Sequence, residues 1–229
     1  MGLRLRRLRD DASGLSLVEL LVSLGLSLLM LVMVATMFIQ VTKITTASNQ
    51  THNSNGVAAN VANELSAVLR VATTLAKSNV ATPDPAIVAG TRSSVTIYSL
   101  SNTSATSPAP VRVTFTLSSA GRVTEDRCIG VASGAYWTFG SCASTSTRIL
   151  GDGILAPTGT GNQLFTYLDV NGTALVPGSG GTGSLTAAQR ALVARIVVVV
   201  RAQAPGSETD AVLVSNTVVL RNLGLDTLS

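Results

Sequence analysis

Two residues near the N-terminus, Gly14 and Glu19, have types and a spacing that could serve chemistry. Gly14 ends a polar, arginine-rich stretch, and a glycine gives a protease close access to an extended backbone. Glu19 lies five residues later, within an apolar run that has no other charge. Inserting a carboxylate into a lipid-spanning helix costs roughly 2.5–3.5 kcal/mol, so we interpret Glu19 as functional and expect it to have a partner.

The apolar run that must position these groups covers residues 15–39. It is long enough to cross a bilayer as a helix, which takes about 20 apolar residues. The four arginines of residues 1–14 hold the N-terminal side in the cytoplasm by the positive-inside rule, so the C-terminal part lies outside. An ordinary secretory signal is disfavoured because its apolar region is only about 7–15 residues long. A signal anchor that is never cut remains the alternative.

The string from Gly14 to Leu20, GLSLVEL, resembles the prepilin processing motif of type IV pilins and type II secretion pseudopilins. The resemblance implies that a prepilin peptidase removes the leader, residues 1–14, by cutting between Gly14 and Leu15, and that it N-methylates Leu15. It also implies that Glu19 pairs with the amino terminus of a neighbouring subunit and so sets the register of a filament. Leu15 replaces the phenylalanine that is commoner in the family.

The remaining residues offer no constellation for catalysis, metal binding or a cofactor. His52 is the only histidine and lies in a polar stretch, so it is expected to be a solvated surface residue. The GSGGTG segment at 178–183 is not followed by the Gly-Lys-Ser/Thr sequence that completes a phosphate loop, and it is expected to be a flexible surface loop. Four acidic residues have no spacing that brings two onto one face: Glu125, Asp126, Asp152 and Asp169. We therefore expect no enzyme.

Cys128 and Cys142 are the two cysteines, and their spacing fits no metal or redox motif. In a head outside the membrane they are expected to form a disulfide, because oxidising compartments preserve such bonds. Closing a loop of about 15 residues would contribute roughly 3 kcal/mol by chain entropy. Two unconnected buried thiols are the alternative.

The helix that begins at residue 15 is expected to continue to about residue 78, with residues 40–80 as its amphipathic part. Its later apolar residues recur at three- and four-residue spacing, which predicts packing against a sheet. This stripe comprises Val57, Val61, Leu65, Val68, Leu69, Ala72 and Leu75. Pro83 and Pro85 then stop the helix, because each lacks a backbone donor.

Beyond residue 85 the pattern changes to period two, which predicts antiparallel strands. The expected strands are residues 94–100, 111–117, 122–128, 163–169, 192–202 and 211–222, the last two paired as a hairpin. Residues 129–160 are expected to form irregular loops. The predicted fold class is α+β, with the long helix packed on an antiparallel sheet in a head of residues 86–229, as in pilins. Residues 163–222 loosely resemble the large minor pilins of the W type and the J-type pseudopilins.

Composition limits the functions of this head. The chain has 229 residues, 46% apolar and 12% charged, with a net charge of +4, of which four arginines and two aspartates of the leader supply half. Without a run of five like charges, a strong claim of DNA binding has no support.

We expect a minor pilin or pseudopilin, processed by prepilin peptidase and assembled with other pilins through its N-terminal helix. It would lie in the cytoplasmic membrane and then in an extracellular or periplasmic filament. The alternatives are a filament-tip module that binds DNA or a surface ligand, and an unprocessed, signal-anchored envelope protein.

Overall fold

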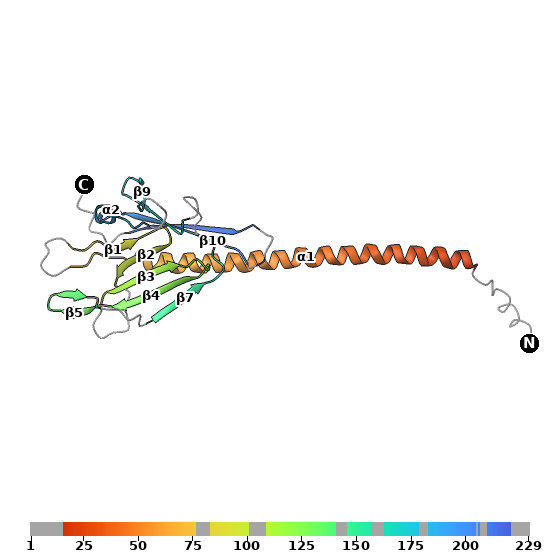
Figure 1. Cartoon of the computed structure of the whole chain (residues 1–229), viewed down its shortest axis with the longest axis horizontal. Coiled ribbons are helices and arrows are strands. Elements are labelled where there is room, and N and C mark those ends of the chain that lie inside the picture. Colours follow the sequence, from red (N-terminus) through yellow and green to blue (C-terminus); the bar gives the residue numbers. More distant parts are fainter. Residues whose placement is uncertain are drawn as a thin grey trace, which may run out of the picture. The chain divides into compact units, whose positions relative to one another are not determined.

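The computed structural model of the chain divides into two compact units, Met1–Ser48 and Asn49–Ser229 (Figure 1). The helix α1 (Leu17–Arg70) has residues in both units. The described residues are 16–76, 83–100, 109–140, 146–156, 163–178, 183–204, 206 and 210–220.

The second unit contains two larger antiparallel sheets and one small one. The five-stranded sheet has the order β1 (Ile87–Gly90), β2 (Ser94–Ser99), β3 (Val111–Leu117), β4 (Val123–Ile129) and β7 (Ser146–Gly151). The four-stranded sheet has the order β11 (Val212–Val219), β10 (Arg195–Ala202), β8 (Phe165–Leu168) and β9 (Ala174–Leu175). The small hairpin pairs β5 (Val131–Ser133) with β6 (Tyr136–Thr138), and a short helix, α2 (Ala187–Leu192), precedes β10. Antiparallel strands with a long helix make this an α+β fold.

The core of the second unit is a single cluster to which α1 and both larger sheets contribute. Leu65 and Leu69 of α1 are fully buried there with Phe115 and Phe165. Tyr167 is also buried, and its hydroxyl donates to the carbonyl oxygen of Thr91 at 2.8 Å. Burial raises the pKa of Tyr167, because the charged phenolate would lose its hydration. The predicted apolar stripe is confirmed: all its residues are buried except Val57, which is partly buried.

The end of α1 differs from the prediction, since the helix stops at Arg70 and not near residue 78. Beyond it the backbone pairs with the sheet: Thr73 N donates to Tyr98 O at 2.9 Å, and Leu75 exchanges two hydrogen bonds with Asp84. These bonds replace helical ones, and the β-branched residues of this stretch suit an extended backbone. The three- and four-residue spacing of apolar residues therefore continues beyond the last residue of the helix.

The predicted strands are largely confirmed. The strand at 111–117 has the expected bounds, and its buried and half-buried residues alternate along its length. The 192–202 and 211–222 segments pair as β10 and β11, from Arg195 opposite Val219 to Ala202 opposite Val212. The turn at Asn171 and Gly172 is also present, since Gly172 has φ +85° and its N–H donates to Asp169 O.

Two regions were predicted wrongly. Residues 129–160 are not all irregular, because they contain β5, β6 and the edge strand β7. β10 begins at Arg195 and not at residue 192, since residues 187–192 form α2. Thr186 and Gln189 form a capping box that starts this helix, a T-x-x-Q signal that was present in the sequence.

A short extended segment, Gly153–Leu155, connects the two larger sheets. Ile154 N donates to Gly121 O at 2.9 Å, while Leu155 N donates to Arg201 O at 2.8 Å. Gly121 has φ +77°, and a Cβ built on it would lie 2.6 Å from Ile154 O. Only a glycine fits this position without moving the connecting segment.

Replacing Gly121 with alanine should therefore lower the free energy of unfolding by about 1–3 kcal/mol, from left-handed strain and the clash with Ile154 O. Urea-dependent pulse proteolysis of the full chain in mild detergent would measure the change. Gly134 is a suitable control, since it also has positive φ but a Cβ added to it would meet nothing within 4 Å. Equal losses for Gly121→Ala and Gly134→Ala would show that the close approach contributes nothing.

Candidate membrane and assembly helix

The first unit presents apolar side chains on every side of α1. Its large hydrophobic residues from Leu17 to Ile44 are all more than half exposed, and the segment is long and apolar enough to cross a membrane. Between Glu19 and Lys43 there is no charged side chain. At 1.5 Å per residue this uncharged stretch spans about 34 Å, close to the thickness of a bilayer's hydrocarbon core. In length and composition the segment meets the requirements of a membrane-spanning helix.

The hydroxyl groups of this segment are satisfied inside the helix. Each donates to a backbone carbonyl three or four residues earlier, at 2.8–3.0 Å. The donors are Ser23, Ser27, Thr36, Thr42, Thr45 and Thr46. A hydroxyl bonded in this way needs no water or neighbour in lipid. The serines and threonines therefore do not disturb the apolar surface.

Glu19 is different, because it carries a charge and lies in the first turn of α1. A carboxylate there is favoured by the helix dipole, and Glu19 is exposed. None of the ion pairs formed by the described side chains involves Glu19. Glu19 is thus available to a group from another molecule.

Gly14 and Leu15, the predicted processing residues, lie outside the described residues, so that site stays a prediction.

The apolar span and Glu19 are the features of the first unit that bear on function. No family model and no curated protein matches the chain. The arrangement can do two things chemically: bury an apolar surface in lipid or against other helices, and offer one carboxylate near the start of that surface.

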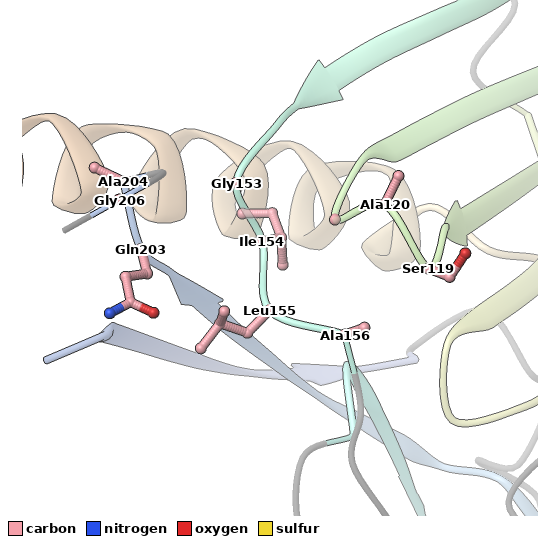
Figure 2. A pocket seen from close by; sticks show the side chains of 10 residues that line it. Ser119, Ala120, Gly153, Ile154, Leu155, Ala156, Gln203, Ala204 and Gly206 are labelled. Carbon is pink, nitrogen blue, oxygen red and sulfur yellow. The ribbon is translucent and has the colours of Figure 1, made fainter. Parts of the chain in front are cut away.

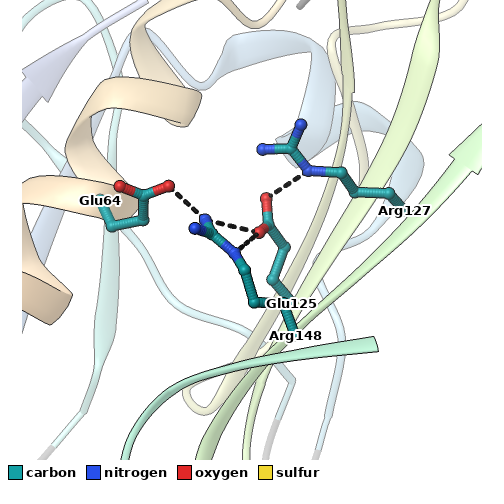
Figure 3. Close-up of polar contacts among 4 residues, drawn as sticks. All are labelled: Glu64, Glu125, Arg127 and Arg148. Carbon is teal, nitrogen blue, oxygen red and sulfur yellow. Dashed lines mark hydrogen bonds and ion pairs between the residues drawn. The ribbon is translucent and has the colours of Figure 1, made fainter. Parts of the chain in front are cut away.

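A cluster of charged side chains lies in the second unit, around Glu125 of β4 (Figure 3). The Glu125 side chain is only 1% exposed. One of its oxygens accepts from Arg127 Nε and the other from Arg148 Nε, both at 2.8 Å. Arg148 also pairs with Glu64 of α1, and both hydrogen bonds raise the pKa of Arg148. We refer to Glu64, Glu125, Arg127 and Arg148 as the ionic cluster.

Sequence reasoning missed this cluster, although it considered Glu125 among scattered carboxylates. The signal was the alternation of β4, which places Glu125 on the same inward face as Val123. A carboxylate on an inward face needs a cationic partner. Its main partner, Arg148, lies in a segment that was expected to be irregular.

The three other carboxylates considered in the sequence analysis also have hydrogen-bond or ion-pair partners. Asp126 accepts a hydrogen bond from Thr147, and Asp152 pairs with Arg122 at 2.7 Å. Asp169 accepts from Thr173 N in its own turn. Within the described ranges, no group of His, Cys, Asp and Glu side chains could hold a metal ion.

Several arginines of the head contact carboxylates or backbone carbonyls. Arg195 donates to Val170 O at 3.2 Å, Arg190 donates to Val88 O, and Arg112 lies 5.6 Å above the ring of Phe139. These contacts are with widely separated parts of the chain. The alternative of a DNA-binding head stays untested by these contacts.

A pocket of about 340 Å³ lies beside the connecting segment Gly153–Leu155 (Figure 2). Small residues and backbone line most of it, and Gln203 is its longest polar side chain. None of the described lining residues is an acid or a base, so nothing in this lining can activate the Ser119 hydroxyl as a nucleophile.

Two further predicted residues can be placed. Cys128 lies in β4, but Cys142 is outside the described residues, so the disulfide stays a prediction. His52 lies on α1 and is exposed, as expected for a surface residue. Of the GSGGTG segment only Gly178 and Gly183 are described, and residues 179–182 lie outside.

Proposed function

We propose that the chain is a minor pilin or pseudopilin, a structural subunit of a type IV pilus or related filament, with a head of the pilin type. The observation that carries this proposal is the single charge of the α1 span, Glu19, in the first turn of an otherwise apolar, exposed helix. A plain anchor has no need of a carboxylate there, and insertion of one costs free energy.

The mechanism follows from the chemistry of the helix. A prepilin peptidase cuts after Gly14 and leaves Leu15 as the new amino terminus. Lateral packing of apolar helices then gives affinity, while Glu19 pairs with the amino terminus of a neighbouring subunit. The subunit moves in this way from the cytoplasmic membrane into a filament with other pilins or pseudopilins.

The second half of α1 supports the same proposal. Its residues Val61, Leu65 and Leu69 are fully buried in the core of the head. A helix with one half built into a folded head and the other half exposed and apolar is suited to join that head to a filament of packed helices. No catalytic group is required of it.

Processing of the leader is the first prediction to test. Intact-mass and N-terminal peptide analysis of the membrane-extracted chain, produced with and without a prepilin peptidase, should show a terminus at Leu15 only with the peptidase. Gly14→Val should leave residues 1–14 attached, because a β-branched side chain obstructs the protease's approach to the backbone.

Ser13→Val is the matched control, since it adds the same bulk one residue away and should be cut like the wild type. A leader that stays attached to the wild-type chain despite an active peptidase would contradict the proposal. That result would leave an anchored envelope protein.

A further inference from the structure

The sequence contains two Asn-Gly pairs, Asn55-Gly56 in α1 and Asn171-Gly172 in the turn between β8 and β9. Such a pair can react with itself, because the backbone nitrogen of the glycine can attack the side-chain carbonyl carbon of the asparagine. Glycine permits this attack since it has no Cβ to obstruct the ring that forms. All four residues are exposed, so water reaches both pairs.

The reaction needs water as its only co-reactant. The glycine nitrogen gives up its proton to solvent and bonds to Cγ of the asparagine, while the bond from Cγ to the amide nitrogen breaks and ammonia leaves with a proton from solvent. The product is a succinimide ring. Water then adds to one of the two ring carbonyl carbons and opens the ring, which leaves aspartate or isoaspartate. Since both reacting groups belong to one chain, the attack is intramolecular.

The backbone around each pair decides whether it can react, because the asparagine must rotate its own carbonyl group to bring the next nitrogen close to Cγ. In α1 the helical hydrogen bonds hold each N–H and C=O in place. Ser54 and Ala58, on either side of the pair, are buried. Opening the helix at Asn55 therefore breaks several hydrogen bonds and moves packed side chains.

At Asn171 the same rotation breaks a single backbone hydrogen bond among those of the described residues. Gly172 N donates to Asp169 O at 3.1 Å, whereas Thr173 N donates separately to the Asp169 carboxylate at 2.7 Å. Within the described ranges the side-chain amide of Asn171 has no hydrogen-bond partner. A Cβ built on Gly172 would have only Arg195 Nη1 within 4 Å, at 3.9 Å, so the ring has room to form.

We propose that Asn171 is a self-modification site, which forms a succinimide with Gly172 and becomes aspartate or isoaspartate, while the helix preserves Asn55. The inference is independent of the proposed function, since it needs only the folded head and water. The product has a carboxylate in place of the amide. Arg195 lies on this turn, because its Nη2 donates to Val170 O at 3.2 Å, so the new negative charge forms beside a cation.

The isoaspartate product also changes the turn. It adds one atom to the main chain before Gly172, so the hydrogen bond from Gly172 N to Asp169 O no longer fits. β9 begins at Ala174, opposite Leu168, and has only two residues to hold its pairing with β8. Asp169 N donates to Thr173 O at 3.0 Å in the unmodified chain, and its amide hydrogen should exchange faster once isoaspartate has formed.

The two pairs allow a test within one molecule. The full chain in mild detergent is incubated in water labelled with a heavy oxygen isotope, and peptides that contain residue 55 or residue 171 are compared by mass spectrometry. Uptake of the label should be at least about tenfold faster at residue 171 than at residue 55, a difference of about 1.4 kcal/mol in activation free energy. In concentrated urea the two rates should become similar, because glycine follows both asparagines and the fold is lost.

Three results would overturn the proposal. The first is equal uptake at the two residues of the folded chain, and the second is a preference for residue 171 that persists unchanged in urea. The third is aspartate without isoaspartate at residue 171. Opening of the ring gives both products, whereas direct hydrolysis of the amide gives aspartate alone.

Variants of the turn identify the attacking nitrogen. Gly172→Ala should slow uptake at residue 171 by at least about tenfold, because a Cβ obstructs the ring. Gly172 has φ +85°, which strains an alanine in the fold, so this variant is compared with the wild type in urea. Thr173→Ala is the matched control, since it keeps its N–H and its side chain takes no part in the ring. Unchanged uptake in Gly172→Ala would exclude attack by the Gly172 nitrogen.

Discussion

Replacing Glu19 with leucine should reduce incorporation of the chain into filaments by roughly one to two orders of magnitude while membrane insertion is kept. The carboxylate costs about 2.5–3.5 kcal/mol to insert, and the proposed pairing with a neighbour's amino terminus would offset a cost of that size. Since each 1.4 kcal/mol is about a factor of ten, loss of the pair weakens assembly strongly. The ratio of the chain in sheared filaments to the chain in membranes measures the effect.

Two further variants define what Glu19 contributes. Glu19→Gln keeps a hydrogen-bonding side chain without the charge, so an assembly defect close to that of Glu19→Leu would assign the effect to the charge. Ser23→Ala is the matched control on the same helix, because the Ser23 hydroxyl donates to Leu20 O at 3.0 Å inside the helix and carries no charge to pair with an amino terminus. Normal assembly of Glu19→Leu would contradict a pairing role.

Replacing Glu125 with alanine should lower the free energy of unfolding of the head by about 1.5–3 kcal/mol. The substitution leaves Arg127 and Arg148 without the carboxylate that both contact, in a cluster where Glu125 is 1% exposed. Arg148 keeps its pair with Glu64 and the two arginine side chains are 35% and 51% exposed, so the loss is that of the charge-assisted hydrogen bonds to a buried carboxylate. Pulse proteolysis in urea, with the full chain in mild detergent, measures the loss.

Asp152→Ala is the control for the ionic cluster. Its pair with Arg122 has the same kind of geometry, at 2.7 Å, but the two side chains are 58% and 51% exposed. An exposed pair of this kind contributes about 1 kcal/mol or less. Equal losses from Glu125→Ala and Asp152→Ala would show that burial of the carboxylate is not what matters.

Local patterns sufficed to predict the elements whose partners are close in sequence. β3 alternates along its whole length and β4 over its first four residues, and the two are joined at Gly121, so their pairing follows from period two and one turn. The β10–β11 hairpin could be predicted for the same reason. The apolar stripe of α1 was found because a helix buries residues three and four apart.

Elements that depend on distant contacts could not be predicted in this way. The end of α1 at Arg70 is decided by backbone bonds from Thr73 and Leu75 to Tyr98 and Asp84, which lie elsewhere in the chain. The ionic cluster likewise joins Glu125 to Arg148 and, through it, to Glu64. No spacing in the sequence reveals such partners, because the fold creates them.

The internal bonding of Ser23, Ser27 and Thr36 has a consequence for how such subunits could evolve. A helix whose hydroxyl groups donate within the helix offers adjoining helices an apolar surface with one charged position, Glu19. Subunits with quite different heads can then pack through the same kind of helix, provided that each keeps a glutamate at this position. In the filament that we propose, the heads are free to diversify, while a substitution of Glu19 would affect the same contact in every subunit that carries it.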